Sequence, residues 1–137
     1  MSMEISVTTQ RTRLPSVKAW QDALDGQRFP FRLDTFDWQD VSGFLPVAYG
    51  KIETGFELYL DEIAEVEEQF GESIPEDHDC SVSFRFGGDP NELKAAMCAA
   101  TTLAQVSNGL FLDPDSGDCL APAEAIESAK EILETKF

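Results

Sequence analysis

The segment from residue 95 to residue 104 constrains the fold most, because it is almost entirely apolar and lies inside a helix with clear ends. Asp89-Pro90 is a typical helix start, with an acidic capping residue before a proline at the first helical position. Asn108-Gly109 is a typical stop. A helix that is apolar on every side must be covered on every side, and its many alanines favour close approach of another backbone element. We therefore predict a buried central helix that ends near Ser107.

The other segments alternate between strand-like and helix-like patterns, with a hairpin signal in the middle. Gly50-Lys51 separates two runs rich in strand-forming residues, as in a short hairpin. Strands are predicted at residues 4–8, 31–33, 44–49, 52–60, 81–86 and 110–112, and helices at residues 15–26, 61–70, 90–107 and from 122 onward. Residues 34–42 are predicted to form a loop anchored by large side chains. This order predicts a single α+β domain over residues 1–137, with a mixed sheet of about five to six strands, a central hairpin and about four helices.

Length and cysteine content place the chain among ordinary small domains. A chain of 137 residues with 42% hydrophobic content suits one domain with its own core. Cys80, Cys98 and Cys119 are odd in number and contain no C-x-x-C pair. The first residues lack the charged-then-apolar layout of a secretion signal, and residues 95–104 are about half as long as a membrane span. We therefore expect a cytoplasmic protein with reduced thiols.

A block of acidic residues without any base occupies the middle of the chain. Between Lys51 and Arg85 there are eleven acids, namely Glu53, Glu57, Asp61, Glu62, Glu65, Glu67, Glu68, Glu72, Glu76, Asp77 and Asp79. The whole chain has a net charge of −16, although residues 1–33 hold five bases against three acids. The electrostatic field of so many unbalanced acids repels nucleic acid and anionic membranes, which bind to basic surfaces. The same field attracts a basic protein. We expect a basic protein partner and neither a nucleic-acid nor a membrane partner.

The residues predicted to bind this partner come from the helix over residues 61–70 and its neighbours. Ile63, Val66 and Phe70 form the inward stripe of that helix, so its glutamates point outward. Asp61 and Glu62 are expected in its first turn, where the helix dipole favours negative charge. The predicted partner-binding residues are Glu57, Tyr59, Glu62, Glu65, Glu68, Glu72, Glu76 and Asp77.

Tyr59 belongs to this set because it alternates with apolar residues and shares a strand face with Glu57. An aromatic ring among carboxylates is a good contact for an arginine or lysine of a partner. A covered second face of the sheet would explain the same residue equally well.

Two acidic segments support a different hypothesis, that of a small-molecule or metal site. Asp77-His78-Asp79 places the chain's one histidine between carboxylates, and metals bind these residue types. The same residues are typical of a solvated loop, in which nearby carboxylates would raise the pKa of His78. Asp113–Asp118 with Glu124 matches a calcium loop at the first, third and twelfth positions but not at the fifth and sixth. A turn leading to a helix also explains that segment.

No motif of a catalytic nucleophile or phosphate-binding loop is present. We predict no catalytic residue, no metal ligand and no cofactor; whether the chain is an enzyme stays open, with the sequence favouring a non-catalytic protein. The favoured hypothesis is an acidic cytoplasmic interaction protein, such as an immunity protein or an inhibitor of a nuclease-type toxin. The alternatives are a small-molecule or divalent-metal-binding domain, or weak enzyme, using Asp77-His78-Asp79 or Asp113–Asp118, and a homodimer formed through the hairpin edge.

Overall fold

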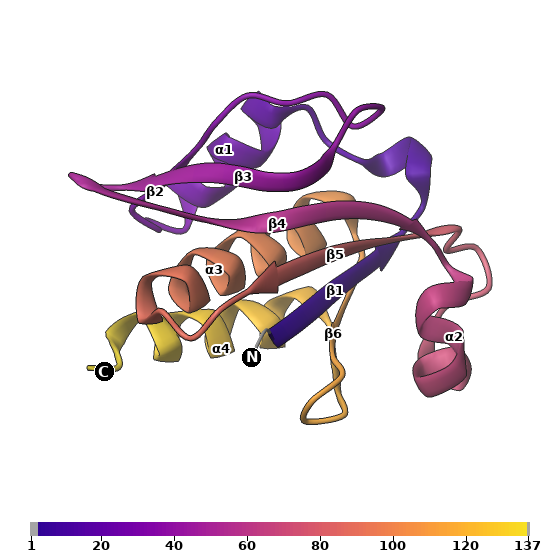
Figure 1. Cartoon of the computed structure of the whole chain (residues 1–137). Helices are drawn as coiled ribbons and strands as arrows, with labels where there is room; N and C mark the ends of the chain where they lie inside the picture. The colour runs from indigo at the N-terminus through magenta and orange to yellow at the C-terminus, as the bar shows by residue number, and fades with distance from the viewer. Residues whose placement is uncertain (1–2, 137) are drawn as a thin grey trace.

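A seven-stranded sheet carries the fold of residues 3–136, which are the residues described by the computed structural model (Figure 1). The strands are β1 (Met3–Thr9), β2 (Phe31–Leu33), β3 (Ser42–Tyr49), β4 (Ile52–Glu62), β5 (Cys80–Phe86), β6 (Leu110–Asp113) and β7 (Asp118–Leu120). Their order across the sheet is β2-β3-β4-β5-β1-β6-β7. Every neighbouring pair is antiparallel. The first strand of the chain therefore lies between β5 and β6.

The predicted central helix is confirmed as α3 (Pro90–Ser107), which lies across one face of the sheet. The Asp89 carboxylate caps it by accepting a hydrogen bond from the backbone N–H of Asn91, and Asn108 ends it in the left-handed conformation, with φ of 51°. Every residue from 95 to 104 is buried. Helices α1 (Val17–Gly26) and α4 (Pro122–Glu134) pack beside α3 in the same layer (Figure 1).

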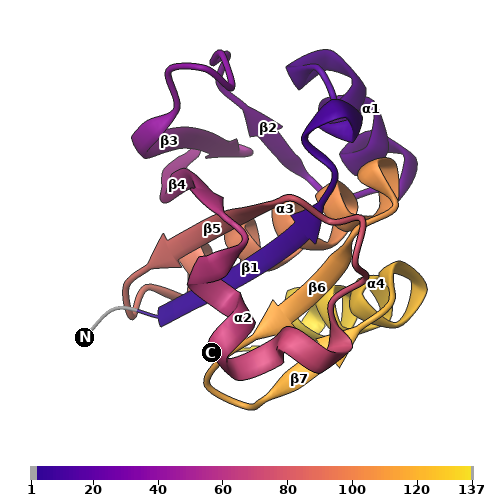
Figure 2. The same ribbon diagram turned by 90° about the vertical axis from the view of Figure 1, so that its right-hand side faces the viewer.

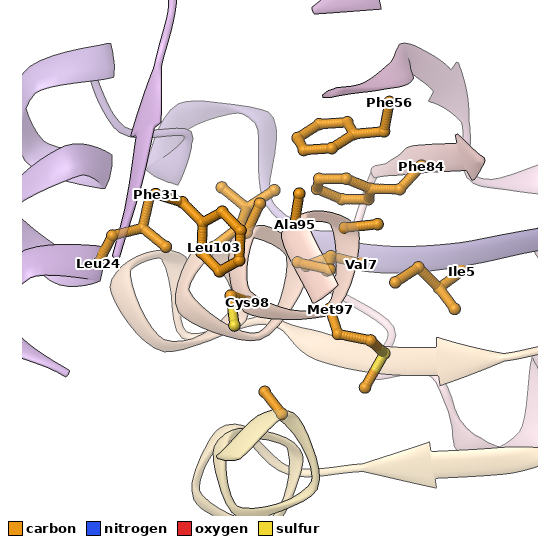
Figure 3. Close-up of a cluster of buried hydrophobic side chains, with 14 of the residues drawn as sticks. Ile5, Val7, Leu24, Phe31, Phe56, Phe84, Ala95, Met97, Cys98 and Leu103 are labelled. Atoms are coloured by element: carbon orange, nitrogen blue, oxygen red, sulfur yellow. The ribbon is translucent and has the colours of Figure 1, made fainter. Parts of the chain in front are cut away.

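Aromatic side chains from the sheet, among them Phe31, Phe56 and Phe84, fill the space around α3 (Figure 3), and α1 adds a further ring. The rings of Phe56 and Phe84 lie 5.2 Å apart between centroids. Trp20 of α1 is fully buried, and its indole donates a hydrogen bond of 2.9 Å to a backbone carbonyl of α3. Trp38, from the predicted loop, stacks on Trp20 at 5.7 Å. The loop over residues 34–41 is therefore anchored as predicted.

The predicted hairpin is formed by β3 and β4, which are joined by the two residues Gly50-Lys51. Gly50 has φ of 59°, which a type II′ turn requires at its first central position. Gly55 has φ of 151°, and the ring of Phe44 lies so close above it that an added Cβ would be 2.6 Å from Cζ. Phe44 is nevertheless 62% exposed. The hairpin thus presents an aromatic ring to solvent on the sheet face opposite α3.

The helix predicted over residues 61–70 begins later than expected. Strand β4 continues through Glu62, and α2 (Ala64–Phe70) starts two residues further on. The prediction that Asp61 and Glu62 lie in the first turn of this helix was wrong. Both residues instead pair with β5, because ladder hydrogen bonds outweigh the small dipole term at an exposed helix end.

The α+β class, the central hairpin and four α-helices within residues 3–136 are as predicted. The sheet has seven strands, slightly more than predicted, and it is antiparallel throughout, whereas a mixed sheet was predicted. The missed strand is β7, a three-residue strand after the Asp113–Asp118 turn, which therefore closes a hairpin and does not lead directly into a helix. None of the helices in the described part of the chain has the length and apolar character needed to span a membrane.

Candidate interaction surface

Helix α2 lies on the sheet face opposite α3, at the end of the sheet formed by β6, and stands apart from the other three helices (Figures 1 and 2). Val66 and Phe70 are buried against Leu112 of β6, together with partly buried side chains of Ile63 and Leu110. Phe111, between the two leucines, belongs to the main core. Because successive strand residues point to opposite faces, α2 and α3 lie on opposite sides of β6. The predicted inward stripe of α2 is thus confirmed.

Eight carboxylates of the α2 region are all exposed. We name them the α2 acidic surface; they are Glu62, Glu65, Glu67, Glu68, Glu72, Glu76, Asp77 and Asp79. The outward direction of Glu65, Glu67 and Glu68, the three on the helix itself, follows from the burial of Val66 and Phe70 on its opposite side. The surface also reaches the turn between β6 and β7, since Gln69 donates a hydrogen bond of 3.0 Å to the carbonyl of Pro114.

The N-terminal segment neutralises one edge of the α2 acidic surface. Arg11 lies 3.9 Å from Glu62, and its backbone N–H donates a hydrogen bond of 2.7 Å to Asp79. Gln10 donates a side-chain hydrogen bond of 2.7 Å to Asp77. The ion pair is long and solvent-exposed, and such pairs contribute at most about 1 kcal/mol. Glu65, Glu67, Glu68 and Glu72 lie beyond this edge, on α2 and the turn that follows it.

Glu57 and Tyr59 lie on strand β4, on the same sheet face as α2 but outside the segment that forms the α2 acidic surface. Both lie on the open face of β4, where the Tyr59 hydroxyl donates a hydrogen bond of 2.6 Å to Glu57. This hydrogen bond raises the pKa of Tyr59 because it stabilises the neutral phenol. The guanidinium of Arg85 lies 5.1 Å from the Tyr59 ring centroid and pairs with Glu4 at 2.8 Å. The cation expected from a partner is therefore already supplied by the chain itself.

His78 lies inside the protein, contrary to the solvated loop that its sequence neighbours indicate. It is 7% exposed, and its Nδ1 lies within 2.9 Å of the Thr8 hydroxyl. Burial lowers the pKa of His78, and this effect outweighs the opposite effect of Asp77. The expectation of a raised pKa was wrong, because the imidazole faces the sheet while the flanking carboxylates point to water.

The metal hypothesis finds no ligand cluster, since residues 3–136 contain no group of three or more His, Cys, Asp or Glu side chains able to hold an ion. In the turn after β6, Asp113 accepts hydrogen bonds from the backbone N–H groups of Asp115 and Ser116. Gly117 follows with φ of 79°. The carboxylate at the first position of the apparent calcium loop, Asp113, therefore holds an Asx turn.

The small-molecule hypothesis retains a shallow pocket of about 350 Å³ beside His78, lined also by Arg13 and Asp77. Thiol chemistry has little support, because burial raises the pKa of Cys80 to about 11 and that of Cys98 to about 12. Such thiols stay protonated and are poor nucleophiles at neutral pH.

Known proteins offer no guide to this arrangement. The chain was compared with protein-family models, with curated proteins and with solved structures, and none of the three comparisons found a match.

Proposed function

We propose that the protein is a non-catalytic interaction protein that binds a basic protein partner through the α2 acidic surface. The observation that carries this proposal is the exposure of all eight carboxylates between residues 62 and 79, in a segment that contains no lysine or arginine. A surface of one charge sign steers an oppositely charged protein toward it and suppresses binding of anionic molecules. An immunity protein or toxin inhibitor is the concrete form, with the carboxylates occupying a cleft that otherwise accepts a phosphate backbone.

The geometry of α2 supports this form of binding. The helix is short and is fixed to the sheet by buried Val66 and Phe70, so Glu65 and Glu68 are presented on a folded element and lose less freedom on binding than they would on a mobile tail. Arg11 and Gln10 contact only Glu62, Asp77 and Asp79 at one edge. The centre of the binding surface is therefore assigned to Glu65, Glu68 and Glu72.

The test compares two variants of equal net charge. Glu65→Lys/Glu68→Lys/Glu72→Lys reverses three of the eight charges of the α2 acidic surface, whereas Asp40→Lys/Glu53→Lys/Glu134→Lys reverses three exposed acids elsewhere. Partners captured at low salt are identified and their dissociation constants are measured at two salt concentrations. The proposal expects a basic partner whose binding weakens with salt, is lost in the first variant and is largely kept in the second. Equal effects of both variants would show that only net charge matters and would refute the assignment to α2.

A further inference from the structure

A second feature of the molecule lies on the other side of the β6–β7 hairpin from α2. A pocket of about 270 Å³ opens between this hairpin, α3, α4 and the beginning of β1. Its floor is apolar, with Ile5, Met97 and Phe111 almost fully buried. Figure 3 shows Ile5 and Met97 at the side of the core away from Leu24 and Phe31. The pocket is therefore an extension of the main core toward solvent.

The mouth of this pocket is anionic. Four acidic residues line it on this side of the sheet, namely Asp113, Asp115, Asp118 and Glu131; Glu4 also borders it, but its carboxylate is turned to Arg85 on the other face, and no lysine, arginine or histidine is among the lining residues within the described chain. Glu4 is paired with Arg85 at 2.8 Å, and Asp113 is engaged in the Asx turn. Asp115, Asp118 and Glu131 are exposed. They come from a turn, a strand and a helix, and all three border the same opening above an apolar floor.

We propose that this pocket binds a small organic cation, a primary amine carried on an apolar chain. The apolar chain would lie on Ile5, Met97 and Phe111, where burial of hydrocarbon is favourable. The ammonium group would stay at the mouth, close to Asp118 and Glu131. There it keeps part of its hydration, so the large cost of burying a charge does not arise.

Charge and size select this ligand class over its neighbours. A carboxylate or phosphate would be repelled by the carboxylates at the mouth. A neutral alkyl chain would make the apolar contacts of the floor but no charge interaction at the mouth. A bare metal ion lacks a cluster of ligands, since the described residues contain no group of three that could hold one. The volume lies just below the usual range of about 300–1,000 Å³ for ligand pockets, so the amine must be small. The pocket is independent of the α2 acidic surface, and either proposal can fail alone.

Hexylamine, hexan-1-ol and hexanoate are matched probes, because they share one chain and differ in charge. Each is titrated into the full chain while backbone amide shifts are followed by nuclear magnetic resonance. We expect hexylamine to shift amides of β6, β7 and α4, and hexan-1-ol to bind about tenfold more weakly. Hexanoate should not shift these amides at the same concentrations.

Two double variants of equal net charge show which carboxylates contribute to hexylamine binding. Asp115→Asn/Asp118→Asn removes two carboxylates of the mouth and keeps Asp113 and Ser116, whose side chains hold the turn. Glu65→Gln/Glu68→Gln removes two from α2. The first should weaken hexylamine binding about tenfold and leave hexan-1-ol unchanged, whereas the second should alter neither by more than about twofold. Ser128→Phe, which places a ring in the pocket, should abolish binding of both ligands.

Equal affinities of hexylamine and hexan-1-ol would overturn the proposal, and so would unchanged hexylamine binding in Asp115→Asn/Asp118→Asn. Shifts confined to α2 would also overturn it, because they would show that the amine is only attracted to the α2 acidic surface. A thermal melt of each variant verifies folding, and the retained binding of hexan-1-ol provides a second check for the double variant of the mouth.

Discussion

The two faces of the sheet are covered in opposite ways. On one face α3 is buried at ten consecutive positions, from 95 to 104, between α1, α4 and an apolar layer of the sheet that includes Phe56 and Phe84. On the other face α2 contributes only Val66 and Phe70, and the strands beneath carry buried hydroxyls. Those of Ser6 and Ser81 have no hydrogen-bond partner within the described chain. The first face provides the stability of the fold, while the second holds a charged surface in place with few contacts.

The largest effect is expected from Phe84→Ala on the α3 face. Phe84 is fully buried and contacts both Phe56 and Trp20, so its truncation leaves a cavity that rigid neighbours cannot fill. We expect the free energy of unfolding to fall by about 3–5 kcal/mol, measured by urea denaturation. A loss below about 1 kcal/mol would mean that this face is not the tightly packed one.

Phe70→Ala is the corresponding change on the α2 face, and its effect should be smaller and local. Phe70 is 6% exposed and belongs to a cluster with few members. We expect a loss of about 0.5–3 kcal/mol, with hydrogen exchange accelerated in α2 well before it changes in α3. Uniform acceleration in both helices would show that the two faces unfold as one unit and would remove the contrast.

This contrast explains which parts of the structure were predictable. The α3 face was predicted correctly because its signals are local and strong: a capped apolar helix, alternating strands and a glycine between two strand-like runs. Strand β7 was missed because three residues are too few to show a period. The antiparallel pairing of β1 with both β5 and β6 brings together residues that are about 80 and about 105 positions apart in the sequence. No local sequence pattern encodes such contacts.

The α2 face was only half predictable. The outward direction of Glu65 and Glu68 followed from helical periodicity, but the late start of α2 depends on where β4 ends. The burial of His78 could not be inferred from its acidic neighbours, because it depends on Thr8, 70 residues away. The pocket between α4 and the β6–β7 hairpin was missed for the same reason, since its carboxylates come from distant segments.

His78 makes the α2 face sensitive to pH. Its pKa is lowered in the folded protein by burial, against the opposing effects of Asp77 and Asp79 and with a small contribution from Arg13. The unfolded chain, with a pKa of about 6.5, therefore takes up a proton first as the pH falls. Stability is complete above about pH 6.5 and declines below it by at most about 1.4 kcal/mol per pH unit, until the pH reaches the folded pKa.

The variant His78→Gln removes this titration while keeping a side chain that can bond to the Thr8 hydroxyl. Urea denaturation at pH 7.5 and 5.5 should show a larger loss of stability for the native chain than for the variant. These pH values lie above the range in which ordinary carboxylates titrate. Identical losses in both proteins would show that the imidazole is not protonated on unfolding in this range.

The smallest effect concerns repulsion within the α2 acidic surface. Glu65 and Glu68 are three residues apart on one helix, and such like-charged pairs cost about 0.2–0.5 kcal/mol. Glu68→Gln should therefore slow hydrogen exchange of α2 amides about twofold, and raising the salt from 0.05 to 1 M should slow it in the native chain more than in the variant, because the screening length falls to about 3 Å.

Amides of α3 provide the internal control for this measurement, since the helix has one acidic residue in its first turn and none in its buried middle. If α2 responded to salt no more than α3 does, the carboxylates would not act on one another through solvent. The electrostatic attraction of these carboxylates for a basic partner would then be weak as well, because the same Coulomb interaction that destabilises α2 would attract a cationic protein. A weak salt response of this short helix would thus count against the proposed interaction before any partner was known.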